Sequence, residues 1–278
     1  MTKGLATGIG FGAVLLWATL ALFTTLAGDV PPLQLLAMCF AIGGGLGLLR
    51  GLPRNVPLGA WVVGIGGLFF YHLVYVLALR AAPPVEASLI AYLWPLLIVL
   101  MSALVQRLRW FHVAGALLGL AGAALVVTGG QGLAFTPAPG HGLALLAALI
   151  WSSYSLLSRR YASVPETAVT GFCLGAALLA GLSHLLLEET VRPEGREWLA
   201  ILALGIGPVG AAFFFWDIGC KRGDLAVLGA SSYAAPLLST LVLVAVGLGT
   251  PSWSLALACL LITGGAALAA MGMWLETH

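Results

Sequence analysis

Ten long apolar runs divide the sequence, and each is long enough to cross a lipid bilayer as an α-helix. A crossing takes about 20 residues, so ten crossings use roughly 200 residues of the chain and leave only short connections. Charged residues make up only 8% of the 278 residues, whereas soluble domains carry about 25%. The sequence therefore predicts an all-α integral membrane protein without a soluble domain. The expected spans are 5–26, 33–49, 58–79, 85–105, 113–127, 142–157, 167–187, 198–220, 225–248 and 255–274.

The second five runs repeat the first five. When the chain is shifted against itself, residues of the same type match in order, and the offset grows slowly from 134 to 143 residues. We therefore expect two repeats of five helices, in residues 1–130 and 141–278, joined by a connecting loop at 131–140. Because five is odd, the copies must cross the membrane in opposite senses, as in the inverted repeats of many transporters. Matched pairs include Trp17 with Trp151, Cys39 with Cys173, Tyr92 with Tyr233, Pro95 with Pro236 and Trp110 with Trp253.

The lysines and arginines indicate how the chain is oriented in the membrane. If the N-terminus is cytoplasmic, nine of these residues lie on the cytoplasmic side and three on the far side. Positive charge concentrates on the cytoplasmic side of membrane proteins, so both termini are expected there. The cytoplasmic set is Lys3, Arg50, Arg54, Arg107, Arg109, Arg159, Arg160, Lys221 and Arg222, and the far set is Arg80, Arg192 and Arg196.

Sequence signatures of enzymes are missing. There is no HExxH, no GxSxG, no P-loop and no pair of carboxylates inside an apolar run. The four cysteines form no CxxC pair, so we expect neither a metal site nor a cofactor. The net charge of +2 is too small to indicate a nucleic-acid partner. The expected partners are the lipid bilayer and a small amphiphilic solute, and the expected state is a monomer.

Aromatic and polar side chains interrupt the apolar runs near their middle, although Tyr and Trp usually favour the membrane surface. In the third run, Tyr71, His72 and Tyr75 are spaced so that they share one helical face. An aqueous cavity would satisfy their polar tips, and packing between helices with bonded tips is the alternative. We interpret this group as the lining of a substrate cavity. Its members are Trp17, Tyr71, His72, Tyr75, Tyr92, Trp94 and Trp151.

Ionisable residues and prolines inside the runs add three expectations. His72 can hydrogen-bond substrate, carry a proton or serve only packing, because intramembrane ionisable groups are costly and often functional. Pro95 and Pro236 remove a backbone hydrogen bond each, so they predict paired hinges or permanent kinks. Asp217 and Lys221 are spaced for an ion pair along one helix. No Asp or Glu is expected at mid-membrane, so proton coupling would have to use His72 or a path of water molecules, and exchange or facilitated diffusion are equally open.

Taken together, these motifs resemble the drug/metabolite transporter superfamily, and within it the ten-span exporters with two EamA-type repeats. The resemblance rests on Leu16-Trp17 and its partner Ile150-Trp151, on the proline-bearing fourth and ninth runs, and on the glycine-rich fifth and tenth. It implies a bacterial inner-membrane protein that works by alternating access through a central cavity. The segments around Tyr71-His72 and Tyr92-Leu93-Trp94-Pro95 are similar to those of the aromatic amino acid exporters.

The resemblance implies an exporter of amino acids, preferentially aromatic ones, and two other functions are alternatives to it. The same aromatic lining would suit a broad metabolite or organic-cation exporter, although no central carboxylate is expected to meet a cation. A membrane receptor or scaffold without transport is the alternative from another class. The chain also departs from the family pattern at Gln106-Arg107, where the family often has an acidic residue. A role for a negative charge at that position is therefore in doubt.

Overall fold

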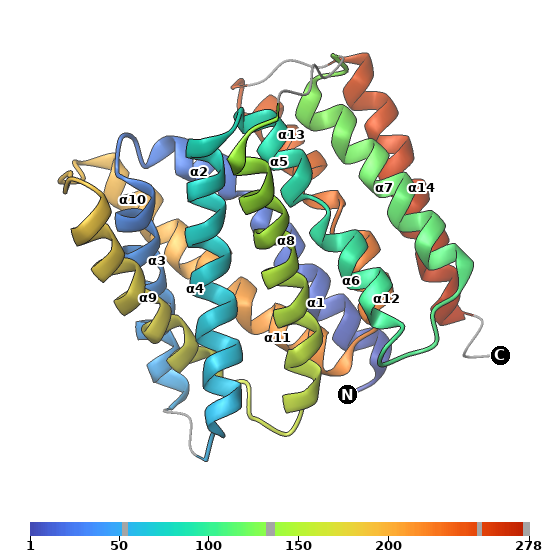
Figure 1. The fold of residues 1–278 in the computed structure, drawn as a ribbon, viewed down its shortest axis with the longest axis horizontal. Coiled ribbons are helices and arrows are strands. Elements are labelled where there is room, and N and C mark those ends of the chain that lie inside the picture. The colour runs from blue at the N-terminus through green and yellow to red at the C-terminus, as the bar shows by residue number, and fades with distance from the viewer. Residues whose placement is uncertain (52–54, 132–136, 249–251, 275–278) are drawn as a thin grey trace.

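The computed structural model describes residues 1–51, 55–131, 137–248 and 252–274 (Figure 1). In these ranges, ten helical stretches are long and apolar enough to span a membrane, as the sequence predicts. Part of the expected connecting loop, residues 132–136, lies outside the described residues. Six spans are continuous helices: α3 (Pro32–Gly47), α4 (Leu58–Ala81), α7 (Trp110–Thr128), α8 (Pro139–Ser158), α9 (Ala168–Leu187) and α14 (Trp253–Trp274).

The other four spans are interrupted near their middle. The first comprises α1 (Lys3–Trp17) and α2 (Leu20–Leu26), and the fourth comprises α5 (Pro84–Ala91) and α6 (Trp94–Ser102). The eighth comprises α10 (Arg196–Ile206), a π-helical turn (Gly207–Ala211) and α11 (Ala212–Arg222). The ninth comprises α12 (Leu225–Ser231) and α13 (Ala234–Ala245). The fourth and ninth spans are repeat partners, and both are broken, whereas the broken first and eighth spans have continuous partners in α8 and α4.

Each interruption has a local chemical cause. The kinks expected at Pro95 and Pro236 are present, because each of these prolines lies in the first turn of the helix that follows the break. Pro208 lies in the π-helical turn of the eighth span, where wider turns often mark functional positions. The first span breaks without proline at Thr19, whose hydroxyl donates to the Leu16 carbonyl at 2.7 Å. Such side-chain bonds to the preceding turn bend helices.

The packing of the helices follows the sequence repeat. Three matching spans pack on each other, in the pairs α3 with α9, α6 with α12 and α7 with α14. The other two large helix contacts are α1 with α11 and α4 with α8. In each of them, the first span of one copy packs on the third span of the other copy. Figure 1 shows α7 beside α14 at one edge of the molecule and α3 beside α9 at the other. This pattern is consistent with the two-fold relation that the sequence repeat predicts.

Glycines allow the closest helix crossings. A Cβ on Gly43 would lie 2.7 Å from the Cα of Gly210, and one on Gly10 would lie 2.9 Å from the Cα of Gly219. Both contacts are between backbones, which have no side chain to move aside. Small residues at such crossings let helices in lipid gain close van der Waals contact, which replaces the hydrophobic driving force of soluble proteins.

We predict that Gly43→Ala lowers the melting temperature, because the added methyl meets backbone atoms that cannot yield. Overpacking of this kind costs about 1 to 3 kcal/mol. Gly45→Ala is the matched control, since a Cβ there meets nothing within 4 Å and alanine favours a helix more than glycine does. The measurement is the amount of folded protein that elutes from a sizing column after heating in detergent. Equal melting temperatures for the two variants would contradict the prediction.

Candidate functional site

A cavity of about 470 Å³ lies between the interrupted spans. All seven side chains that the sequence singled out line it, and they come from α1, α4, the break of the fourth span, α6 and α8. Its volume falls within the usual range for small-molecule sites, about 300 to 1,000 Å³. The sequence-predicted residues in the lining are Trp17, Tyr71, His72, Tyr75, Tyr92, Trp94 and Trp151.

Several other lining residues were not foreseen. Pro208, Val209 and Phe213 come from the eighth span, and Ala235 and Ser239 come from α13. Phe213 is the repeat partner of His72 by an offset of 141 residues. The two rings now meet edge to face with centroids 6.1 Å apart. The repeat itself was thus the signal that could have identified Phe213.

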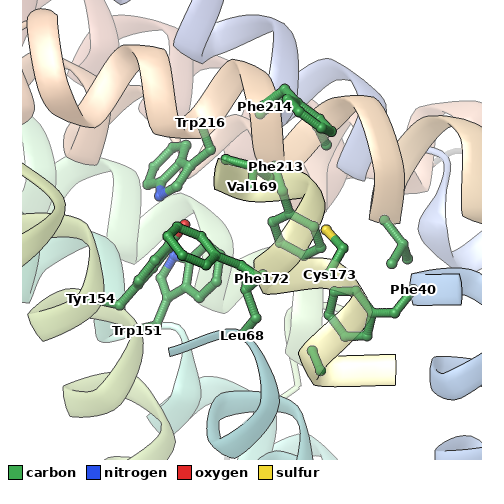
Figure 2. Close-up of a cluster of buried hydrophobic side chains, with 14 of the residues drawn as sticks. Phe40, Leu68, Trp151, Tyr154, Val169, Phe172, Cys173, Phe213, Phe214 and Trp216 are labelled. Carbon is green, nitrogen blue, oxygen red and sulfur yellow. The ribbon is translucent and has the colours of Figure 1, made fainter. Parts of the chain in front are cut away.

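Four indole rings from four different spans form the base of the cavity. Trp17 lies 5.6 Å from Trp151 and 5.0 Å from Trp216 between ring centroids. Trp94 completes the group at 5.7 Å from Trp216. Edge-to-face and tilted pairs of this kind stabilise by about 0.5 to 1.5 kcal/mol beyond their buried area. Figure 2 shows Trp151, Phe213 and Trp216 in a cluster of buried hydrophobic side chains.

The polar tips of these rings fall into two groups. The Trp17 Nε1–H donates to the Pro208 carbonyl at 3.0 Å, and the buried Trp216 Nε1–H donates to the Ser155 hydroxyl at 3.0 Å. The Tyr75 hydroxyl is bonded to Ser88 at 3.1 Å. These three polar groups are hydrogen-bonded within the protein, as expected if their rings serve packing between helices. By contrast, the Tyr71 and Tyr92 hydroxyls and the Trp94 and Trp151 Nε1–H groups have no hydrogen-bond partner in the described part of the chain.

His72 is held in one orientation by its own helix. Its Nδ1 lies 2.6 Å from the Leu68 carbonyl, and because a carbonyl can only accept, Nδ1 carries a proton. The ring edges contact Phe40 and Phe213. In the neutral form, Nε2 is therefore the acceptor, and it belongs to a residue that lines the cavity.

The lining offers hydrogen bonds and ring faces but no formal charge. Within the ranges that the structure describes, no Asp, Glu, Lys or Arg side chain lines the cavity. A ligand with one positive and one negative group is compatible with such a lining. Aromatic faces attract a cation, and indole N–H and phenol O–H groups donate to an anion.

A polar cluster joins four segments at the end of the molecule that carries the N-terminus. Asp224, the N-cap of α12, accepts from the Lys3 ammonium and from the Gln106 side chain, both at 2.8 Å. Gln106 in turn accepts from Arg159 at 3.1 Å, and Arg159 also donates to the Gly223 carbonyl at 2.9 Å. An amide, which donates and accepts, thus occupies the position where the family often has a carboxylate. None of Lys3, Gln106, Arg159 and Asp224 lines the cavity.

Asp224 is stabilised in its charged form. Burial alone would raise the pKa of this carboxyl, but hydrogen bonds from Lys3, Gln106 and the Val227 N–H outweigh burial and hold the pKa below its ordinary value. Since the folded pKa is lower than the unfolded one, the charged Asp224 stabilises the fold at neutral pH. This contribution disappears as the pH falls through the folded pKa.

A second set of ionic contacts lies at the opposite end. The Glu188 carboxylate accepts from Arg80 at 2.8 Å and from the N–H of Leu33 at 3.0 Å, and it contacts His184 at 3.1 Å. It therefore ties the start of α3 and the end of α4 to the end of α9. Glu188 follows α9 and is the acidic residue that these three helix ends share.

The ion pair expected between Asp217 and Lys221 is confirmed. Their charged atoms are 2.7 Å apart, and both side chains are buried in α11. Lys221 also donates to the Val164 carbonyl at 3.0 Å. The pair thus anchors α11 to the connection between α8 and α9, and it lies outside the lining of the central cavity.

Ten spans around a central aromatic cavity define a polytopic membrane transporter. A model of the EamA-like transporter family matches the chain twice, at residues 5–128 and 138–271. The chain therefore belongs to the EamA-like transporter family, and it is a multi-pass membrane transporter, not an enzyme.

The chain is also similar to individual known proteins over nearly its whole length. The chain is 56% identical to the aromatic amino acid exporter YddG of Ancylobacter novellus, over 98% of this chain and 99% of that protein. It is 28% identical to YddG of Escherichia coli over 100% of this chain and 99% of that protein. One solved crystal structure superposes with a TM-score of 0.93 at 56% identity, covering 97% of this chain and 99% of the other.

We predict that Asp224→Asn destabilises the protein at pH 7, because the amide cannot pair with Lys3 as a charge. Loss of charge-assisted hydrogen bonds costs about 1.5 to 3 kcal/mol. The difference in melting temperature between wild type and variant should begin to narrow as the pH falls below about 4, the unfolded pKa of an aspartate, and should disappear only below the lowered folded pKa of Asp224. The control is Asp29→Asn, since Asp29 is exposed. A difference that stays constant from pH 7 to pH 3 would refute the account of Asp224.

Proposed function

We propose that this protein is a secondary transporter that exports amino acids, preferentially aromatic ones, from the cytoplasm across the bacterial inner membrane. One observation carries the proposal: eight aromatic or imidazole side chains, the seven expected from the sequence and Phe213, line a single cavity of about 470 Å³. The close relationship to an aromatic amino acid exporter supports it. Such a lining can stack on an aromatic ring, attract an ammonium group to its π faces and donate hydrogen bonds to a carboxylate.

Alternating access is the proposed mechanism. The two copies, 1–130 and 141–278, would move about the cavity between them, with Pro95 and Pro236 as hinges. The cavity is lined by residues of α2, the second half of α5 and α13, whereas Lys3 and Asp224 are not part of the lining. With both termini cytoplasmic, this arrangement corresponds to a conformation closed toward the cytoplasm.

The proposed substrate-binding residues are Trp17, Tyr71, His72, Tyr75, Tyr92, Trp94 and Trp151. Among them, Tyr71, Tyr92, Trp94 and Trp151 keep unbonded polar tips, so these four are proposed to bond the polar groups of the substrate. Trp17 and Tyr75, whose tips are bonded within the protein, would contribute ring faces.

A broader metabolite or organic-cation exporter is the second candidate. Relatives at 28% identity include a biotin transporter of Salmonella typhimurium, so the family scaffold accommodates different solutes. The uncharged lining disfavours organic cations, which gain most from a carboxylate. A receptor or scaffold would bind without flux.

Counterflow in proteoliposomes tests the proposal directly. Vesicles loaded with unlabelled Phe, Trp or Tyr should accumulate external radiolabelled Phe only when they contain the protein. A panel of other amino acids, biotin and a quaternary ammonium compound measures the substrate range. Flux of another solute class without flux of Phe, Trp or Tyr would refute the substrate assignment, and binding without any flux would favour a receptor.

We predict that Tyr71→Ala raises the half-saturating concentration of Phe about two- to tenfold, the equivalent of one lost aromatic contact. The Tyr71 ring lies 4.9 Å from Trp151 and is parallel to Tyr75, so its loss removes one face of the cavity. Trp110→Ala is the control, because Trp110 is 73% exposed and far from the lining. The same half-saturating concentration in Tyr71→Ala as in wild type would argue against a binding role.

A further prediction concerns His72 as a proton carrier. His72→Asn keeps an N–H donor for the Leu68 carbonyl but cannot titrate near neutral pH. If His72 carries the proton, this variant should lose the pH dependence of Phe flux between about pH 5 and 8, where histidines titrate, while flux itself persists. Unchanged pH dependence in the variant would exclude His72 as the proton carrier and leave exchange or facilitated diffusion.

A further inference from the structure

Matching residues of the two repeats occur together in the lining of the cavity. Trp17 matches Trp151, and both line the cavity with their ring centroids 5.6 Å apart. His72 matches Phe213, and these two rings are also part of the lining. In both pairs, a ring in one copy corresponds to a ring in the other.

A third matching pair in the lining differs in size. Trp94 matches Ala235 by an offset of 141 residues, the same offset that relates His72 to Phe213. Each of the two directly precedes the proline of its broken span, and each lines the cavity. The first copy thus places an indole where the second copy places a methyl group.

The Trp94 side chain fills a place between three other indoles. Its ring lies edge to face with Trp17 at 6.3 Å, with Trp151 at 6.2 Å and with Trp216 at 5.7 Å between centroids. Edge-to-face contacts of this kind are favourable for aromatic rings. The Ser152 hydroxyl donates to the Trp94 carbonyl at 3.0 Å, which ties the start of α6 to α8. On this side of the cavity, the protein supplies its own aromatic ring.

Ala235 lies on the face of α13 that borders the cavity. Ala235 and Ser239 are four residues apart, so they share one face of the helix. Both line the cavity, whereas the three residues between them do not. In addition, α13 packs less closely on α1 and α5 than its counterpart α6 packs on α8 and α12. The cavity therefore extends, beside Ala235, into the place that corresponds to the Trp94 indole.

Aromatic side chains already surround that place. The three indoles around Trp94 have repeat partners that all line the cavity. These partners are Trp151, Trp17 and Tyr75. Because Trp17 and Trp151 are partners of each other, the same two indoles serve both sides of the two-fold relation. A ring in that place would meet two indoles and a phenol, much as Trp94 meets three indoles.

We propose that the aromatic ring of the substrate binds beside Ala235, in the place that corresponds to Trp94 of the first copy, and that the small Ala235 side chain determines which rings fit. The inference rests on the proposed function, because it takes the substrate to be an aromatic amino acid. The place corresponds to an indole in the other copy, so it accepts rings up to that size. The bound ring completes the pseudo-symmetric set of aromatic side chains.

The test enlarges position 235 and measures whether the loss of binding depends on the size of the ring. Binding of radiolabelled Phe to the purified protein is measured in competition with unlabelled Phe and with unlabelled Trp. The readout is the half-inhibitory concentration of Trp divided by that of Phe. Ala235→Val should raise this ratio about fivefold or more, because the larger indole meets the added methyl groups first and overpacking is unfavourable. Ala235→Leu should raise the ratio further or abolish the binding of both.

Leu241→Trp is the matched control for added bulk on α13. Leu241 is 38% exposed and is not part of the cavity lining, so this variant should keep the wild-type ratio. Elution from a sizing column verifies that each variant is folded. If Ala235→Leu does not fold, the smaller change in Ala235→Val decides.

The outcomes separate this inference from the proposed function. Phe binding and counterflow in wild type, with the wild-type ratio in folded Ala235→Val and Ala235→Leu, would overturn the position of the ring and leave the transport function standing. An equal rise for Phe and Trp, or loss of both already in Ala235→Val, would also overturn it, because the effect would not depend on ring size. Absence of Phe binding and counterflow in wild type would overturn both.

Discussion

In the hydrocarbon core of a membrane, every backbone N–H and C=O must find a partner within the protein, which is why spanning segments are helical. This structure depends on where that requirement is relaxed. Four of its ten spans are interrupted, and residues at or beside all four interruptions line one cavity: Trp17, Tyr92, Pro208 and Ala235. The six continuous helices surround and support these irregular segments. Irregular backbone is tolerated there because it faces a cavity and not lipid.

The sequence predicts much of this arrangement because its strongest signals are local. Apolar runs define the spans, prolines define the breaks at Tyr92–Leu93 and Ser232–Tyr233, and helical spacing groups Tyr71, His72 and Tyr75 on one face. The break at Thr19 and the π-helical turn at Gly207–Ala211 were not predicted. Thr19 acts through one side-chain bond to Leu16, and threonines elsewhere in the spans make similar bonds without a break.

Contacts between distant spans were beyond the local pattern. Lys3 and Asp224 meet across most of the chain, and Gln106 joins them to Arg159. Nothing in the sequence around any one of these residues identifies the other three. The repeat could have identified further residues near the cavity, because it pairs His72 with Phe213 and Tyr75 with Trp216. Both partners lie in or against the cavity, so a two-fold frame carries different chemistry on its two sides.

The neutral lining also bears on energetics. Each elementary charge that crosses a membrane potential of 100 mV changes the free energy by about 2.3 kcal/mol. Within the described ranges, no charged side chain lines the cavity, so in the proposed alternating-access cycle an empty site would reorient without carrying charge across the field. A zwitterion adds none. Voltage would then bias neither half of the cycle, and the concentration ratio of the solute alone would set the direction of net flow. A cycle that moved a proton on His72 would be the electrogenic exception.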